Sequence, residues 1–343
     1  MRILVCVILC LLFSLKSHAY ESYYESTESF GRASVDSGNL DYIHSSFNHP
    51  AELHSQRGWR WFFKINGHLS DKTYSLISDV PEPVEGQLEE ELSKHFGEKY
   101  TLNANAVVGV GIGPLTLIPY YRKGRARAEL NYKVYPEATG YIQMDTGFMA
   151  ALGHKFGKFF AGANFFSFER EQDIYTVDLV SSYNETYNHK GKERLNSVNA
   201  SLGYMLDETV DKESSVYLTW KNLNSPNSGS DYAVYNEDLI PLINLGIQKR
   251  YEKILMDLNV LDINNYYESI WQNRVRLGVA YNFSQYAIIR NVNAGLLDGN
   301  LSLGASANLF RILNLSFSTY EKNMYHFYNK KNRFYSVGFE ISF

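Results

Sequence analysis

Apolar and polar residues alternate along much of the chain, most regularly in its C-terminal third. In the segment 274–283, RVRLGVAYNF, the odd-numbered residues are apolar and the even-numbered ones are charged, polar or small. The segment 301–309, LSLGASANL, repeats this pattern. Successive side chains of a strand point to opposite faces, so each segment predicts a strand with one apolar and one polar face. A tilted strand needs about 9–11 residues to cross a bilayer, whereas soluble strands average about 5–6.

Further segments have a comparable pattern. They are 59–66, 103–112, 115–122, 125–134, 141–152, 158–169, 196–206, 215–223, 242–251, 254–263, 285–292, 312–320 and 334–343. Turn signals separate them, namely Gly113-Pro114, Lys123-Gly124, Pro136, Gly157, Asn264-Asn265 and Asp298-Gly299. Bacterial barrels usually have an even strand number, so we predict an all-β transmembrane antiparallel barrel of about 14 strands, within a range of about 12–16. The polar stretches 172–193 and 224–237 are predicted to be long extracellular loops.

Two regions depart from the alternation. Residues 85–96, EGQLEEELSKHF, place Leu88, Leu92 and Phe96 at helical spacing and predict a short amphipathic helix, with a solvated loop as the alternative. Residues 20–57 are polar with little periodicity. Such a segment before the first strand can fold into the lumen as a hatch-like plug or lie on the periplasmic side.

The last ten residues, FYSVGFEISF, form the most specific local pattern. Their apolar face carries Tyr335, Val337, Phe339, Ile341 and Phe343. A final strand with a terminal aromatic resembles the known clients of the barrel-assembly machinery, so these five residues are a candidate assembly signal. An ordinary edge strand of a soluble protein is the alternative reading.

The first 19 residues predict a secretory signal peptide. Arg2 precedes an apolar run from Ile3 to Leu15, and Ser17-His18-Ala19 fits the small-x-small cleavage rule. An uncleaved anchor is the alternative, although the run is short for a membrane helix. Both cysteines, Cys6 and Cys10, lie in this segment, so the mature chain is expected to offer no thiolate nucleophile or thiolate metal ligand.

Composition and charge narrow the functional classes. Without residues 1–19, 31 basic residues stand against 37 acidic ones, a formal charge of −6, which argues against a nucleic-acid partner. The chain contains 27 Tyr, 20 Phe and 4 Trp, and transmembrane barrels place such residues in girdles at both membrane interfaces. These features predict the outer membrane of a Gram-negative bacterium.

Three motifs resemble the superfamily of FadL-type fatty-acid transporters, TraF-like transfer proteins and PorV-like secretion barrels. In NLDYIHSSFNHPAEL, residues 39–53, Asn48, Pro50, Ala51 and Leu53 match a hatch motif, although His49 is inserted. Residues 256–263 with 273–279, and residues 288–304, resemble two family hairpins. The likeness covers the C-terminal third well and implies about 14 strands with an N-terminal hatch. It does not decide the function, because members transport, anchor or assist secretion.

Motifs for catalysis or cofactor binding are weak. The run Gly109-Val110-Gly111-Ile112-Gly113 is followed by Pro114 and another strand, so wall packing explains it better than a dinucleotide loop. The N-terminal histidines are His44, His49, His54 and His68, which indicate solvated residues more than a metal site. His154 and Asp145 lie in no recognisable catalytic motif. We expect no catalytic residue, no cofactor and no metal.

The polar faces of the strands supply the functional candidates. Those expected to line the lumen are Arg125, Arg127, Glu129, Arg274, Arg276 and Asn282. A sealing network of paired charges is the alternative to a permeation role.

The expected domains are a signal peptide at 1–19, a plug or periplasmic segment at 20–57, and a barrel at 58–343 with the helical insertion near 85–96. One hypothesis is a transport barrel for a hydrophobic or small solute; the other is a non-transporting scaffold for a secretion or conjugation apparatus. An apolar region behind residues 20–57 would favour transport, and a lumen blocked by paired charges and aromatics would favour the scaffold. Expected partners are outer-membrane lipid, the barrel-assembly machinery, and the solute or secretion components.

Overall fold

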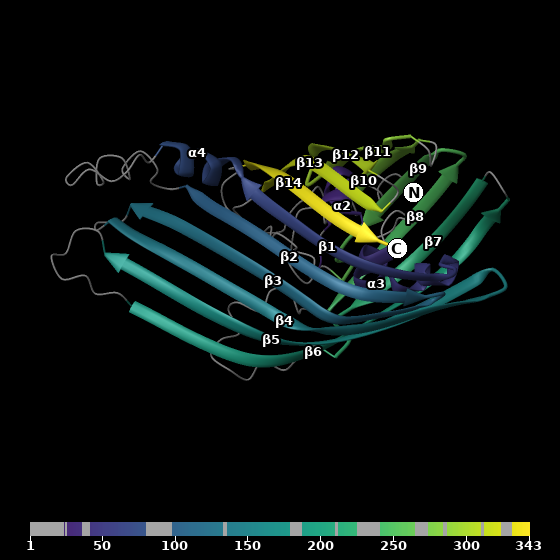
Figure 1. The fold of residues 1–343 in the computed structure, drawn as a ribbon, viewed down its shortest axis with the longest axis horizontal. Helices are drawn as coiled ribbons and strands as arrows, with labels where there is room; N and C mark the ends of the chain where they lie inside the picture. Colours follow the sequence, from purple (N-terminus) through teal and green to yellow (C-terminus); the bar gives the residue numbers. More distant parts are fainter. Residues whose placement is uncertain are drawn as a thin grey trace, which may run out of the picture.

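The described residues form a closed barrel of fourteen antiparallel strands in the computed structural model (Figure 1). They are residues 24, 26–35, 42–79, 98–132, 136–178, 187–209, 212–224, 241–264, 274–283, 287–309, 312–323 and 331–343. Each strand pairs with its neighbours in sequence, and β14 closes the barrel on β1. The predicted fold class and strand number are confirmed.

The strands differ in length around the barrel. Those of ordinary length are β1 (Trp59–Ser70), β2 (Lys99–Ile112), β7 (Lys212–Lys221), β8 (Leu242–Tyr251), β9 (Ile254–Val260), β10 (Val275–Asn282), β11 (Ile289–Leu297), β12 (Asn300–Leu309), β13 (Leu313–Asn323) and β14 (Lys331–Ser342). The long strands are β3 (Leu115–Tyr132), β4 (Pro136–Phe156), β5 (Phe159–Asp178) and β6 (Tyr187–Glu208). They project beyond their neighbours as a one-sided wall (Figure 1).

The expected turn at Lys123-Gly124 was wrong. Lys123 pairs with Asn105 of β2 and with Asp145 of β4, so the two candidates 115–122 and 125–134 belong to one strand. An irregularity in β3 lies instead between Ile118 and Tyr121, where Pro119 interrupts the register. Proline cannot donate a ladder hydrogen bond, so it is confined to such irregular or edge positions.

The predicted loop at 172–193 was also wrong over most of its length. Residues 172–178 belong to β5 and residues 187–193 to β6, and the two pair in register. Outward-facing Lys192 lies 2.6 Å from Glu169 and 2.9 Å from Glu171. Charges on the lipid face are costly, so this part of the wall stands in water. Both faces of the sheet are polar there, which removes the alternation that reveals a strand.

On the part of the barrel that all fourteen strands share, the outer face carries an apolar band. On β10, Val279 is 45% exposed whereas Arg276 is 3% exposed, as the period of two requires. The outward residues of β14 include Tyr335, Val337 and Phe343, which are all exposed. This places the five candidate assembly residues on the outer side of the last strand or at its end; their role in assembly stays a prediction.

Val279 lies midway along the outer face of β10, so Val279→Arg is expected to destabilise the folded barrel by about 2–4 kcal/mol. The control is Thr146→Arg on β4, which also faces outward but pairs in register with Arg122 and Glu169, at the level where charges are already present. That substitution should change stability by less than about 1 kcal/mol. Equal losses in denaturant titrations of the vesicle-inserted proteins would contradict the assignment of the lipid face.

The connections orient the barrel in the membrane. At one end they are 113–114, 157–158, 209–211, 252–253, 283–288 and 310–312, and at the other they include 71–98, 222–241 and 261–274. Outer-membrane barrels have short periplasmic turns and longer extracellular loops. The end that holds Phe343, whose backbone exchanges hydrogen bonds with Trp61, is therefore periplasmic, and the β3–β6 wall is extracellular.

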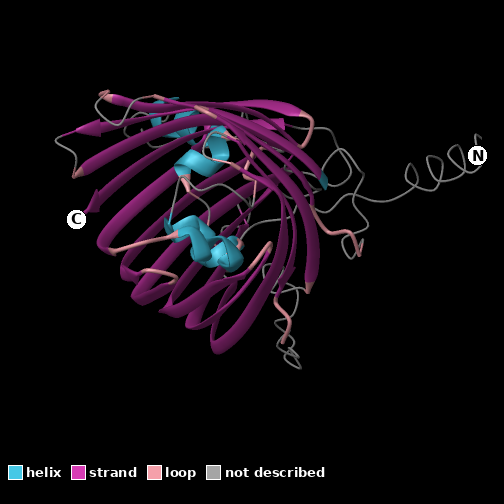
Figure 2. Ribbon diagram, turned by 90° about the vertical axis from the view of Figure 1, so that its right-hand side faces the viewer, coloured by secondary structure: helices cyan, strands magenta, loops and turns pink. Residues whose placement is uncertain are grey.

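Three short helical elements lie within the barrel (Figure 2). They are α2 (Thr27–Gly31), α3 (Tyr42–Asn48) and the 3₁₀ helix η1 (Pro50–Ser55). A fourth helix, α4 (Asp71–Asp79), follows β1 outside the lumen. The predicted elements at 1–19, 85–96 and 225–237 lie outside the described residues. Among the helices that are described, none is long and apolar enough to cross a bilayer.

Candidate functional site: the lumen and the N-terminal segment

The described residues 24, 26–35 and 42–57, here called the N-terminal segment, pack closely against the inner wall. A β-carbon at wall residue Gly153 would lie 2.6 Å from the Pro50 carbonyl oxygen, and one at Gly278 would lie 2.8 Å from the Arg32 carbonyl oxygen. Glycine lacks that atom and permits close backbone approach. The other wall glycines in such contact are Gly111, Gly162, Gly295, Gly304 and Gly338. The glycine run at 109–113 therefore includes one packing position against the segment, at Gly111.

The segment and one half of the wall share a buried apolar cluster. The segment contributes Tyr24, Tyr42, Ile43, Phe47 and Leu53, and strands β1–β6 contribute Phe62, Val107, Ile118, Tyr121, Met149, Ala151, Phe166, Phe168 and Leu195. Phe47 stacks on Tyr24 with ring centroids 4.8 Å apart, and Phe166 stacks on Phe168 at 5.4 Å. A lumen filled only with water would be polar, so this half of the barrel interior is built to exclude water.

The hatch-motif residues hold the segment at four points. The amide of Asn48 donates to the Tyr24 carbonyl at 3.0 Å, and its oxygen accepts from Lys221 at 3.2 Å. Pro50 lies against Gly153, and the Ala51 N–H donates to Ser201 at 2.7 Å. Leu53 is fully buried in the apolar cluster. The inserted His49 is accommodated by Thr219, 3.0 Å from its Nδ1, and by the Tyr217 ring.

On the opposite side of the lumen the segment is held by charge. Arg32 forms a 3.0 Å ion pair with Asp257 of β9, and both side chains are almost completely buried. Arg276 of β10 donates to the Ser34 carbonyl at 2.8 Å. Neither Arg32 nor Asp257 is among the candidates chosen from sequence. Asp257 had a detectable signal, because ILMDLNV places this acid on the inward face of an alternating strand.

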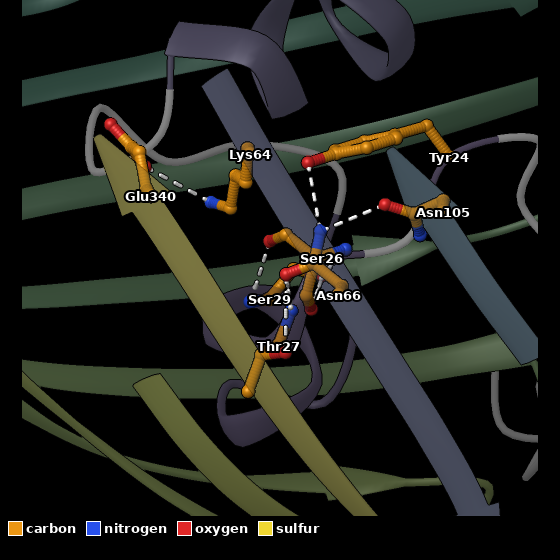
Figure 3. A network of polar contacts seen from close by, with 8 residues as sticks. All are labelled: Tyr24, Ser26, Thr27, Ser29, Lys64, Asn66, Asn105 and Glu340. Carbon is orange, nitrogen blue, oxygen red and sulfur yellow. Dashed lines mark hydrogen bonds and ion pairs between the residues drawn. The ribbon is translucent and has the colours of Figure 1, made fainter. Parts of the chain in front are cut away.

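A polar network joins α2 to β1, β2 and β14 (Figure 3). The Asn66 amide donates to Tyr24 and to Asn105, and its oxygen accepts from the Thr27 hydroxyl at 3.2 Å. Thr27 also lies 2.7 Å from Ser336. Lys64 and Glu340 form a 3.3 Å ion pair nearby. These contacts leave the carboxamide of Asn66 fully bonded.

Above the apolar cluster, a row of charges crosses the inner face of the extracellular wall. In register the row reads Lys123 of β3, Asp145 of β4, Arg170 of β5 and Glu193 of β6. Arg170 binds Asp145 through two hydrogen bonds of 2.8 Å, and both side chains are fully buried. Adjacent strands thus alternate in sign, and opposite charges facing one another stabilise a sheet.

The lumen-lining candidates do not form one site. Arg125, Arg127 and Glu129 follow Lys123 on the inner face of the β3 wall, above the apolar cluster. Arg276 contacts the N-terminal segment, and Arg274 donates to the Leu261 carbonyl at 3.3 Å just before β10. Asn282 lies at the periplasmic end of β10. The buried ion pairs Arg170–Asp145 and Arg32–Asp257 join other residues of the interior.

The N-terminal histidines lie in different environments and do not contact a common ligand position. His44 lies 3.0 Å from the Val35 carbonyl, His54 bonds the Ala51 carbonyl at 2.7 Å, and His68 lies edge-on to Phe30. Burial lowers the pKa of His54, which favours the neutral ring at pH 7. Among the described residues, no group of three or more His, Cys, Asp or Glu is arranged to hold a metal ion.

His154 and Asp145 lie on the same strand, β4, but on opposite faces. Asp145 is buried beside Arg170, whereas His154 is exposed on the outer surface next to Phe156. These two residues therefore cannot act on one substrate.

No protein-family model and no curated protein matches the sequence. Among solved structures, the chain is similar to a TodX deltaS2S3 mutant, a monoaromatic hydrocarbon channel, with 7% identity, a TM-score of 0.50 and coverage of 96% of this chain and 99% of that one. It also matches the toluene transporter TbuX of Ralstonia pickettii, with 10% identity, a TM-score of 0.46 and coverage of 96% and 98%. The protein is an outer-membrane β-barrel. The expected FadL-type resemblance is confirmed in the fold.

Proposed function

We propose that this barrel is a transport channel for a small hydrophobic solute and that the N-terminal segment is its hatch. The observation that carries the proposal is the apolar cluster inside the lumen. It joins aromatic side chains of the segment to those of β1–β6, so a hydrophobic solute that displaces the segment would meet an apolar surface on the wall. The fold of a hydrocarbon channel is compatible with this activity. We propose no catalytic role.

A second candidate function is a non-transporting scaffold. The buried pairs Arg170–Asp145 and Arg32–Asp257 and the stacked rings of Phe30, Tyr320 and Phe334 favour a lumen that stays closed. In that case the protein would act through its extracellular wall or its periplasmic end on components of a secretion or conjugation apparatus.

Uptake of radiolabelled toluene by intact Gram-negative cells that express the protein separates the two. Phe166→Gln replaces an aromatic side chain of the apolar cluster with a polar one, so an apolar solute that passes there would lose about 1–2 kcal/mol of favourable contact with the wall. We expect protein-dependent uptake to fall about tenfold, because 1.4 kcal/mol corresponds to that factor.

The matched control is Phe165→Gln on the same strand, where the side chain faces lipid. It should leave uptake within about twofold of the unmodified protein. Heat-modifiable migration of both variants in the outer-membrane fraction confirms that they fold. Uptake no faster than in cells without the protein would refute transport and support the scaffold.

A further inference from the structure

Five buried polar residues on the inner face of β11–β13 have side-chain atoms without a hydrogen-bond partner among the described residues. This polar strip consists of Asn291, Asn293, Ser306, Asn314 and Ser318, each more than nine-tenths buried. The atoms concerned are Nδ2 of Asn291, Oδ1 of Asn293 and of Asn314, and the hydroxyl oxygens of the two serines. Buried polar groups in native proteins are normally satisfied by protein, water or ligand.

The strip differs from the wall that contacts the segment. On β5 and β6, the amides of Asn164 and Asn199 both donate to the Phe47 carbonyl, at 3.0 and 3.1 Å. On β1, Asn66 is bonded on every side (Figure 3). The amides of Asn66, Asn164 and Asn199 thus bond to the segment, whereas each residue of the strip keeps one polar atom that no described group matches.

The strip has a defined extent. It begins beside α2, where Asn293 and Ser318 flank Gly304 in register and Gly304 touches Gly31. It continues through Asn291 and Ser306, which pair directly, to Asn314 near the start of β13. That end adjoins Glu340, which pairs with Asn314 in register and with Lys64 by charge. The strip thus runs from α2 toward the periplasmic mouth, on the side of the lumen away from β3–β6.

The chemistry of the strip selects its ligand. Asn293 donates to Asn291 at 3.1 Å, which leaves a donor on Asn291 and an acceptor on Asn293 side by side. A hydroxyl group both donates and accepts, so it matches this pair, and the serine hydroxyls offer the same complement. The strip itself carries no charge that would compensate an ion.

We propose that the polar strip is a binding site for small neutral polyhydroxylated solutes that enter from the periplasmic side. This site is separate from the apolar cluster and does not depend on hydrocarbon transport. Its ligand is recognised by neutral amide and serine hydroxyl groups, whereas the apolar cluster is formed by aromatic and aliphatic side chains.

Cysteine labelling of the full barrel tests the proposal, because the only cysteines of the sequence are Cys6 and Cys10, which are replaced by serine. Ser306→Cys should react with a small neutral water-soluble maleimide at least tenfold faster than Ala305→Cys, which faces lipid on the same strand. Glycerol at molar concentration should slow the reaction at position 306 at least threefold more than at Arg57→Cys, an exposed position that reports viscosity and intrinsic reactivity. Sodium glycerate, a charged relative, should not protect.

Equal labelling at 305 and 306 would overturn a site that solutes can enter. Equal slowing by glycerol at 306 and 57 would overturn polyol binding, as would equal protection by glycerate. If Ser306→Cys does not show heat-modifiable folding, Ser318→Cys replaces it at the upper end of the strip. Toluene uptake by the same variants is expected to be unchanged, so failure of this site and failure of hydrocarbon transport are separate results.

Discussion

Arg170→Met is expected to destabilise the barrel by about 3–5 kcal/mol, because it leaves the Asp145 carboxylate buried without its partner. Both side chains are fully buried and joined by two hydrogen bonds of 2.8 Å. The remaining hydrogen-bond donor to the carboxylate is the Gln143 amide at 3.0 Å, and a neutral amide does not compensate a full charge. Denaturant titration of the protein in lipid vesicles measures the loss.

Two controls separate this effect from simple loss of packing. Arg170→Met combined with Asp145→Leu removes both charges and should recover most of the stability, since replacing a buried pair with apolar residues is often neutral. Lys192→Ala breaks an exposed cluster on the outer face of the same wall and should cost less than about 1 kcal/mol. A double variant as unstable as Arg170→Met alone would show that the side chain acts through its bulk.

The sequence predicts the barrel best where the wall separates two different environments. In 301–309 every second residue faces lipid and the others face the lumen, so hydrophobicity alone gives the strand and its faces. Residues 172–178 and 187–193 meet water on their outer face as well, and the period of two disappears although the strands continue. The turn expected at Lys123-Gly124 was wrong because a charged residue followed by a glycine is typical of turns, whereas here the strand continues through both residues.

The interior of the lumen is less predictable because its contacts join residues far apart in the sequence. Arg32 lies in a stretch without periodicity, and its partner Asp257 stands 225 residues later, on the ninth strand. Local spacing cannot reveal such a pair, although an acidic residue on the inward face of β9 indicates that its charge has a partner inside the lumen. The hatch motif marked Pro50 and Ala51, but Gly153 and Gly162, which make room for them, carry no local signal of that role.

Asp257→Ala is expected to release the first half of the N-terminal segment from the wall. The substitution removes the carboxylate from the buried Arg32–Asp257 pair, at a cost of about 3–5 kcal/mol. The wall does not need the segment for its ladder, since β9 pairs through its backbone with β8 and β10. The cost is therefore relieved by withdrawal of Arg32 into water, and residues 26–35 become accessible.

Limited trypsin digestion of the folded protein in vesicles tests this expectation, because trypsin cleaves after arginine. Cleavage at Arg32 should be at least tenfold faster in Asp257→Ala than in the unmodified protein, while the barrel itself stays heat-modifiable. Asp257→Asn keeps the size of the side chain but not its charge and should behave similarly. Glu321→Ala is the matched control, since it breaks an ion pair with Arg333 that is largely exposed, and exposed pairs contribute about 0–1 kcal/mol. Unchanged protection of Arg32 in Asp257→Ala would mean that the glycine contacts and the apolar cluster hold the segment without this charge pair.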